Sequence, residues 1–404
     1  MRSFFDLVGF EYKKIFKRKG AVVAIAIIML LSLIGPIGVF IGNIYIDGEL
    51  FESNYQAMTK DRSHARALSG RSIDETLLTE TKDAFEKIPL SKINEIFMII
   101  PEYQEHGRPY KGIYNIANDI YGGNLQLMQN LTQEQMQNFY QIRHKIISDN
   151  INAMDISDKS KDKLIQLDSE IQTPLIFDYI GGYEYFFQML YSTGIFAAFA
   201  IAICLAPMFA GEYGTHTDQL ILSSKFGKNK LIIAKLFTGV SFCAIFSAII
   251  TIMTYLAGSV IFGFDGANAP IQLFYIFSIY PMTILQGAVA CSICVLFAAI
   301  LVGGITLLLS SVFKSPFGVI IIISLLIFVP MMIQAPDNNV LIWNLFRLLP
   351  VNIMWVAMSL IDYLPYELFG LTIPPYVFMP LFAALASAVT LPFAYSAFKN
   401  HQLG

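Results

Sequence analysis

The chain contains several long segments of apolar residues without charges, and these segments restrict it to folds that a membrane can hold. The first runs from Ala21 to Ile46 without a single charged side chain. The hydrocarbon core of a bilayer, about 30 Å thick, needs about 20 such residues in a helix. With 55% hydrophobic and only 14% charged residues over 404 positions, the chain is too apolar for one water-soluble domain. The sequence therefore predicts an all-α polytopic membrane protein.

Six apolar segments are predicted to be transmembrane helices. They cover residues 20–46, 185–210, 231–264, 271–313, 316–334 and 375–398. A cleaved secretory signal is the alternative for the first segment, which is too long for one and has no small-residue cleavage motif after it. The cysteines all lie inside these segments, so we expect them to pack between helices rather than to form disulfides or a zinc site: Cys204, Cys243, Cys291 and Cys294.

Basic residues beside the first segment predict the orientation of the chain. They directly precede the segment and comprise Lys13, Lys14, Lys17, Arg18 and Lys19. Because basic residues in short loops stay in the cytoplasm, the N-terminus is expected there. Six crossings return the C-terminal tail, residues 399–404, to the same side. We therefore expect a multi-pass protein of the plasma (cytoplasmic) membrane with both termini in the cytoplasm.

One further apolar segment, residues 340–361, leaves the number of crossings open. Arg347 and Pro350 interrupt it, and it carries Trp343 and Trp355, the two tryptophans of the chain. Proline breaks helices, a charge is costly in hydrocarbon, and tryptophan favours the membrane interface. We expect a re-entrant or interfacial segment within an extracellular stretch, residues 335–374. The alternative is a seventh span that places the C-terminus outside.

Residues 1–19 are predicted to form an amphipathic helix on the cytoplasmic membrane surface. Apolar side chains recur there at helical spacing, at Phe5, Val8 and Tyr12. The polar side is expected to carry Asp6, Glu11, Lys13, Lys14 and Lys17. The alternative is an unstructured basic leader that only orients the first span.

Residues 47–184 have the composition of a water-soluble protein and are predicted to form an extracellular domain between the first two spans. Helical signals dominate this domain. Ser72 with Glu75, and Thr132 with Gln135, both have the spacing of a capping box at a helix start. Proline and glycine divide its middle into short pieces. The domain is therefore expected to be mainly helical.

The sequence lacks the motifs of several enzyme classes. No P-loop pattern and no H-E-x-x-H pattern occurs, and the five histidines are scattered. The net charge of −3 also argues against a nucleic-acid partner. No acidic or basic residue is placed clearly inside the core of a predicted span, although ion-driven transporters usually need one there. We therefore expect no enzymatic activity, metal or cofactor in this chain, and an energy source on another chain if it transports.

The predicted cytoplasmic loop of residues 211–230 has an unusual composition. It begins with an acid, Glu212, at the mouth of a span, contains the apolar group Leu220, Ile221 and Leu222, and ends in lysines. Exposed apolar side chains on a short loop often dock onto another molecule. The alternative is a plain connector whose leucines dip into the bilayer.

This loop resembles the signature of the ABC type-2 permeases, the membrane subunits of ATP-binding-cassette exporters. That pattern has the form F-x-x-E-x-x-x-G-T, followed by apolar residues, small residues and a lysine that starts the next span. The matching positions are Phe209, Glu212, Thr217, Leu220, Ile221, Leu222, Ser223, Ser224 and Lys235. The departures are His216 at the glycine of the pattern, Lys225 at a common proline and Ala234 at a common glycine.

The resemblance implies specific partners. Residues 211–230 would form a coupling helix in a groove on a separate ATPase, with contacts from Glu212, Tyr213, Thr217, Leu220, Ile221 and Leu222. Two permeases, of the same or different chains, would pair with two ATPase subunits, which hold ATP and magnesium. The N-terminal helix would lie on the membrane through Phe5, Val8, Tyr12, Lys13 and Lys14. The large external domain is similar to that of the branch with sodium-export and bacteriocin or antibiotic self-protection exporters.

The predicted function is therefore the export of a hydrophobic or amphipathic substrate, such as a peptide antibiotic, a drug or a lipid-like molecule. The spans have few deep charges, which suits such a cargo better than a bare ion. Two alternatives stay open. One is a sodium-type ion exporter of the same architecture, and the other is a membrane sensor or scaffold whose extracellular domain binds a ligand.

Overall fold

The computed structural model describes residues 4–46, 49–89, 100–123, 125–224, 227–333 and 339–401. Its main feature is a bundle of long apolar helices. The helices of this bundle are α2 (Lys19–Ile34), α10 (Gly181–Leu205), α13 (Ile232–Phe262), α14 (Ile284–Val312), α15 (Pro316–Met332) and α18 (Pro375–Lys399).

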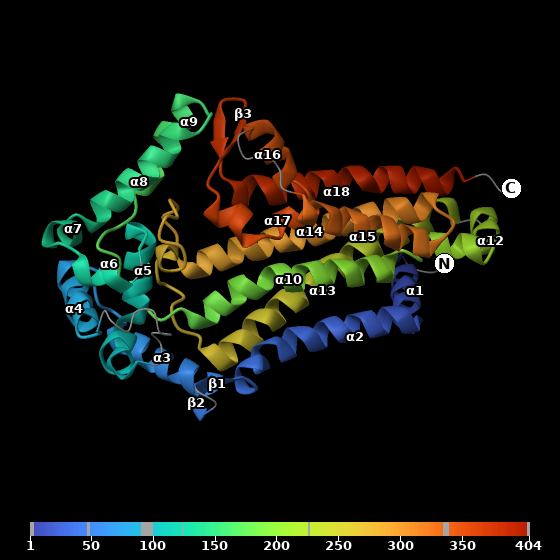
Figure 1. The fold of residues 1–404 in the computed structure, drawn as a ribbon. Coiled ribbons are helices and arrows are strands. Elements are labelled where there is room, and N and C mark those ends of the chain that lie inside the picture. Colours follow the sequence, from blue (N-terminus) through green and yellow to red (C-terminus); the bar gives the residue numbers. More distant parts are fainter. Residues whose placement is uncertain are drawn as a thin grey trace.

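The bundle has two distinct ends (Figure 1). A helical domain formed by the described residues between 49 and 180 lies at one end, which we call the domain end. The short helices α1 (Phe4–Lys17), α11 (Ala210–Gly214) and α12 (Thr217–Ser223) lie at the other, together with the end of α18. We call this the α12 end.

Within the described residues, five helical segments are long and apolar enough to cross a membrane. They are Lys19–Phe40, Gly181–Gly214, Gly227–Phe262, Ile284–Val312 and Pro375–Lys399. The prediction of an all-α polytopic membrane protein is thereby confirmed. The sixth predicted span, residues 316–334, contains α15, an apolar helix of 17 residues that falls short of that length; residue 334 lies outside the described residues.

Two of the predicted spans have wrong boundaries. The first ends early, because a short 3-10 helix, Gly35–Phe40, follows α2 and strand β1 (Asn43–Ile46) then pairs with β2 (Glu49–Ser53). The stretch 271–313 becomes a long helix only at Ile284. Thr283 caps this helix in a reciprocal capping box with Gln286, and residues 271–282 pack as a loop between α13 and α14.

Small residues allow the bundle helices to approach closely. A Cβ on Gly303 of α14 would lie 2.2 Å from the Cys243 sulfur of α13, and one on Gly239 of α13 would lie 2.7 Å from Leu307. Small side chains at such crossings let helices pack closely where no hydrophobic drive exists between them. All four cysteines are free and buried, in agreement with a packing role.

The helical domain has a hydrophobic core of its own, which includes Leu77, Phe85, Ile113 and Phe139. Its helices are α3 (Asn54–Leu68), α4 (Glu75–Glu86), α5 (Lys111–Tyr121), α6 (Leu125–Asn130), α7 (Gln133–Gln137), α8 (Phe139–Ala153) and α9 (Asp158–Ser169). The mainly helical character predicted for this domain is observed.

One of the two predicted capping boxes of the domain is correct. Thr132 and Gln135 exchange both hydrogen bonds at the start of α7. The box expected at Ser72 is wrong, because Asp74 caps α4 by accepting from the backbone of Leu77. Ser72 is instead held in an antiparallel β-bridge with Ile176.

Direct polar contacts fix the domain to the bundle. The buried Arg143 of α8 donates to the carbonyls of Ile276 (2.6 Å) and Ser278 (2.7 Å) in the loop before α14, and pairs with Asp168 of α9 at 2.7 Å. At the tip of α9, Ser160 bonds Thr372 of the hairpin β3 (Tyr366–Leu368) and β4 (Leu371–Ile373) at 2.8 Å. The domain and the helix bundle are thus joined at more than one point.

The segment 340–361 is broken into short pieces, as the position of Pro350 predicted. It contains α16 (Val340–Arg347), α17 (Pro350–Ile353) and a π-helical turn, Ala357–Ile361. Arg347 is fully buried, and its guanidinium donates to the carbonyls of Leu364 (2.8 Å) and Met358 (3.0 Å). These carbonyls and the Asp362 carboxylate, 3.7 Å from Arg347 Nε, compensate the buried charge. No helix in the segment is long enough to span a membrane.

Candidate functional site

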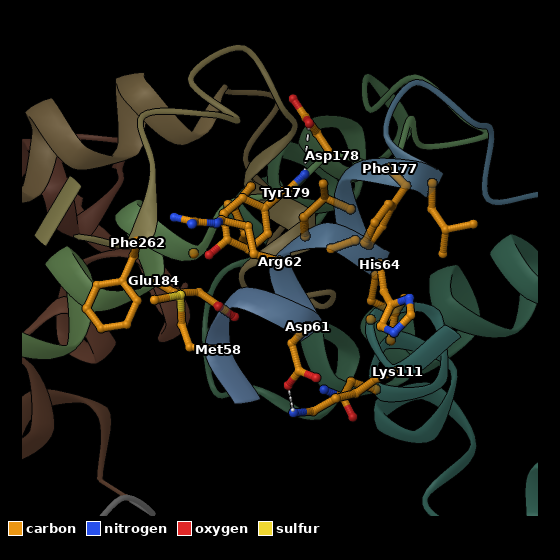
Figure 2. A pocket seen from close by; sticks show the side chains of 18 of the residues that line it. Met58, Asp61, Arg62, His64, Lys111, Phe177, Asp178, Tyr179, Glu184 and Phe262 are labelled. Carbon is orange, nitrogen blue, oxygen red and sulfur yellow. Dashed lines mark hydrogen bonds and ion pairs between the residues drawn. The ribbon is translucent and has the colours of Figure 1, made fainter. Parts of the chain in front are cut away.

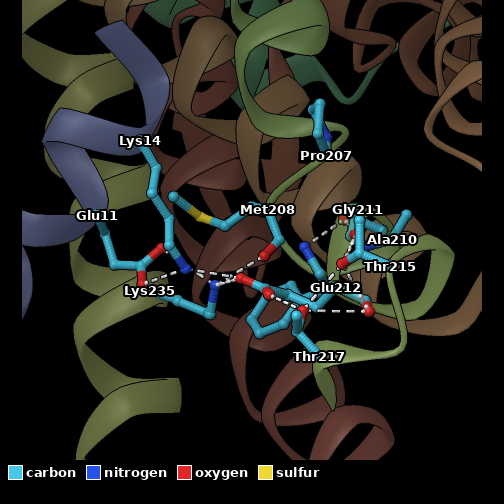
Figure 3. A network of polar contacts seen from close by, with 12 residues as sticks. Glu11, Lys14, Pro207, Met208, Ala210, Gly211, Glu212, Thr215, Thr217 and Lys235 are labelled. Carbon is cyan, nitrogen blue, oxygen red and sulfur yellow. Dashed lines mark hydrogen bonds and ion pairs between the residues drawn. The ribbon is translucent and has the colours of Figure 1, made fainter. Parts of the chain in front are cut away.

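The candidate site is a buried ion network at the α12 end, centred on Lys235 in the first turn of α13 (Figure 3). Lys235 is 0% exposed. Its Nζ donates to Glu11 Oε2 at 3.0 Å, to Glu212 Oε1 at 2.9 Å and to the carbonyl of Met208 at 2.9 Å. All three donor positions of the ammonium are therefore used, as a buried charge requires.

A second ammonium completes the network. Lys14, one turn from Glu11 on α1, lies 2.7 Å from Glu212 Oε1 and 3.1 Å from Glu11 Oε1. Burial works to lower the pKa of Lys14, but the Glu11 and Glu212 carboxylates outweigh it and raise the pKa above its ordinary value. Two ammoniums and two carboxylates thus form a neutral, interlocked set. Removing one partner of a buried pair typically costs about 3–5 kcal/mol.

The network also holds the turn between α11 and α12. Thr217, the first residue of α12, donates to the second carboxylate oxygen of Glu212, Oε2, at 2.5 Å. His216 just before it has a left-handed backbone, with φ of 54°. Such a conformation turns the chain sharply between two helices, and only glycine adopts it without strain.

Further contacts tie the break between α10 and α11 to the neighbouring helices. Ser310 of α14 accepts from the backbone N–H groups of Phe209 and Ala210, both at 3.0 Å, and donates to the carbonyl of Ala206 at 2.7 Å. Tyr213 donates to the carbonyl of Ser311 at 2.7 Å. The loop base is therefore bound to α1, α13 and α14 together.

The structure separates the predicted coupling residues into two groups. Glu212, Tyr213 and Leu222 are buried inside the chain, and Thr217 bonds Glu212. Their contact with an ATPase stays a prediction; within the chain, Glu212, Tyr213 and Thr217 bond to neighbouring residues. Leu220 is 73% exposed and Ile221 is half-buried. Leu220 and Ile221 form an apolar tip at the surface.

The predicted interfacial helix exists as α1, but one of its faces was assigned wrongly. Phe5 and Lys13 are exposed, Val8 is buried, and Tyr12 shares a 2.8 Å hydrogen bond with Ser241 of α13. Glu11, expected on the polar side, is buried against Lys235. Its position, three residues after Val8, places it on the buried stripe of the helix.

Lys235 lies in the first turn of α13, near the end of a span, so it does not contradict the expectation of span cores without charges. This residue lies within the apolar segment Gly227–Phe262, and its counter-charges come from α1 and α11. In the sequence, Glu212 and Lys235 were marked only by their places in the permease-like pattern, and no signal marked Glu11.

No protein-family model matches the sequence, and neither curated proteins nor solved structures give a significant match. The geometry of the chain therefore has to support any function by itself. In the described ranges, no group of three or more His, Cys, Asp or Glu side chains is arranged to hold a metal ion.

Proposed function

We propose that the chain is the membrane permease subunit of an ATP-binding-cassette exporter. In this proposal it resides in the plasma membrane with the α12 end in the cytoplasm. A separate ATPase, which binds ATP and magnesium, docks on α12 and drives the export of a hydrophobic or amphipathic molecule.

The observation that carries the proposal is an exposed apolar tip on a rigid base. Leu220 is 73% exposed on α12, whereas Asp218 and Leu222 of the same short helix are buried. An exposed leucine at a water-facing end is stabilised when a partner covers it. The base of the loop is bound to α1, α13 and α14, so a push on the tip moves α10 and α13 as a unit.

Residues that carry the resemblance to type-2 permeases also contact one another. Lys235 Nζ lies 2.9 Å from Glu212 and 5.7 Å from the centre of the Phe209 ring. His216, at the glycine of that pattern, has the left-handed backbone that glycine adopts most easily. The phenylalanine, glutamate and lysine of the pattern thus contact one another in this chain.

Six crossings suit this proposal. With 17 residues, α15 measures about 25 Å along its axis, close to the thickness of a bilayer core. It follows α14 at the α12 end and leads to α16, while α18 ends at the α12 end again. In the proposed assembly, two such permeases pair with two ATPases.

The test is co-purification of an ATPase with the tagged full-length chain. We expect a chain that carries a P-loop and hydrolyses ATP to co-purify with the wild type. Leu220→Asp and Ile221→Asp should lose that ATPase and the export activity, because a carboxylate resists burial in an apolar groove.

The control is Phe369→Asp on the β3–β4 hairpin, at the domain end. Phe369 is fully exposed and its φ is 51°, a backbone that aspartate tolerates. This variant should retain the ATPase. Retention of the ATPase and of export by Leu220→Asp would overturn the proposal.

A cavity at the domain end supports a second candidate, a membrane sensor that binds an external ligand. A sensor of this kind would bind its ligand, and no ATPase would co-purify with it. The same co-purification therefore separates the two candidates.

A further inference from the structure

A large cavity lies between the helical domain and the bundle (Figure 2). Its volume is about 720 Å³, within the range of pockets that hold drug-sized ligands. In the view of Figure 2, Glu184, Met58 and Phe262 lie on the left, and Asp61, Lys111 and His64 lie on the right. The cavity thus has walls from the domain and from the bundle.

Helices present regularly spaced side chains to this cavity. Helix α10 contributes Glu184, Tyr185 and Gln188 from its first two turns, and α5 contributes Lys111 and Asn118. Spacings of three, four and seven residues place side chains on one helix face. The wall is therefore built from rigid elements rather than from loops alone.

The basic side chains of the wall already have partners. Asp61 accepts from Lys111 at 2.8 Å and from Arg108 at 2.6 Å, and Arg62 donates to the carbonyl of Ile261 at 3.0 Å. Although burial alone raises the pKa of Asp61, Lys111 and Arg108 together lower it below its ordinary value. Asp61 thus stays ionised and acts as counter-charge to Lys111 and, together with Glu52, to Arg108. Lys111 and Arg108 are therefore paired with a carboxylate, whereas Arg62 is held by a backbone carbonyl.

Acceptors in the same wall are unused. The Glu184 carboxylate is open to the cavity and makes no hydrogen bond or ion pair with any described residue. Asn118 Oδ1 and His64 Nε2 are buried without a hydrogen-bond partner among the described residues. Burial, reinforced by the charge of Arg108, lowers the pKa of His64, so its ring is neutral and able to accept. Buried polar atoms are almost always partnered by protein or ordered water, so the Asn118 and His64 acceptors, together with the accessible Glu184 carboxylate, are available to a ligand that donates.

Aromatic rings form the apolar part of the cavity. Tyr185 and Phe262 stack at 4.9 Å between ring centres, and Phe177, Tyr179 and Phe274 also line the walls. Aromatic faces attract cations, and the attraction grows where water is excluded. A carboxylate beside several aromatic faces is the combination that recognises a positive charge on a hydrophobic body.

We propose that this cavity binds an amphipathic organic cation, a protonated amine on an aromatic or hydrophobic body, with Glu184 as its counter-ion. The role of this cation as the exported cargo rests on the proposed function. Binding itself does not, because the cavity is complete within one chain.

The test uses the purified full-length chain in detergent and ethidium as the probe. Ethidium is a cation with amino groups whose fluorescence rises when it leaves water. Glu184→Gln keeps the size of the side chain and removes its charge, and should weaken ethidium binding about tenfold or more. The matched control is Glu134→Gln on α7, an exposed residue outside the cavity, which should bind like the wild type.

A second variant does not depend on Glu184. Met58→Trp adds volume inside the cavity and should reduce ethidium binding although it leaves the carboxylate in place. The anilinonaphthalene sulfonate anion, of similar size, should bind far more weakly than ethidium at this site. Each variant is first shown to elute and unfold like the wild type.

Two outcomes would overturn the inference: equal ethidium affinity in the wild type and Glu184→Gln, or displacement of ethidium by the anion as readily as by a cation. Its failure is distinguishable from that of the proposed function. Loss of ethidium binding with an ATPase still bound refutes only the cargo site, and binding without any ATPase refutes only the exporter.

Discussion

The two ends of the molecule treat their charged groups differently. At the α12 end, Glu11, Lys14, Glu212 and Lys235 satisfy one another within 3.1 Å. At the domain end, Asp61 is saturated but the Glu184 carboxylate has no such partner among the described residues. Charges that are paired with one another stabilise the contact between the helices that carry them. A charge without a partner in a cavity is available to a ligand.

The largest expected effect on stability is at the α12 end. Lys235→Met leaves Glu11 and Glu212 buried with only Lys14 to balance them, and should lower stability by about 3–5 kcal/mol. Thermal unfolding of the purified chain in detergent measures this loss. The double variant Lys235→Met with Glu11→Gln should recover part of it, since it removes one uncompensated carboxylate. Unchanged unfolding of Lys235→Met would mean that the network is not a structural joint.

The next largest effect on stability concerns the ion pairs of Asp61 in the cavity wall. Asp61→Asn removes the carboxylate that pairs with Lys111 and Arg108, and should cost about 1–3 kcal/mol. The pKa of Asp61 is lowered in the folded state, so its stabilisation is present above the ordinary value and is lost as the pH falls through the folded value. The difference between wild type and variant should therefore be full at pH about 6 and shrink below about 4.

Unfolding curves at several pH values test this dependence. Asp149→Asn, an exposed aspartate on α8, serves as the control and should show no such difference. A gap between wild type and Asp61→Asn that stays constant down to low pH would contradict the assigned ion pairs.

A smaller effect on stability is expected in the turn between α11 and α12. His216→Gly relieves the left-handed backbone at φ 54° and should raise stability by about 0.5–1 kcal/mol. His216 is exposed, so the loss of its side chain costs little packing. Glycine at exposed Gln219 of α12 should instead lower stability, because that position is helical. A destabilised His216→Gly would show that the imidazole itself holds the turn.

The smallest effect on stability is expected at the domain end. Glu184→Gln should change stability by less than about 0.5 kcal/mol, because no described partner loses a contact. The same thermal assay compares it with Lys235→Met. A loss as large as that of Lys235→Met would remove the contrast between the two ends and indicate a hidden structural role for Glu184.

Local patterns predicted local structure well. The uncharged segments correspond to long helices, and the spacing of Thr132 and Gln135 correctly predicted the start of α7. The errors are also local in origin. Ser72 lost the cap of α4 to Asp74 two residues later, and the apolar residues 271–282 pack as a loop because Thr283 starts the helix.

The candidate site was only half visible in the sequence. Glu212 and Lys235 were noted as part of a pattern, but their pairing with Glu11 was not. Amphipathic spacing alone assigned Glu11 to the polar face, since periodicity treats every charge as solvent-exposed. A charge is buried when a partner from elsewhere in the chain meets it, and that partner is not part of the helix.

The sequence by itself determined that this protein is a membrane-embedded helical bundle with an inserted helical domain, because apolar length and capping spacing act over a few neighbouring residues. Only the tertiary structure decided which charges are paired within the chain and which face a cavity without a partner. Lys235 meets Glu11 from 224 positions away, and the cavity combines α3, α5 and α10. Such contacts depend on how helices pack against one another, which no local pattern encodes.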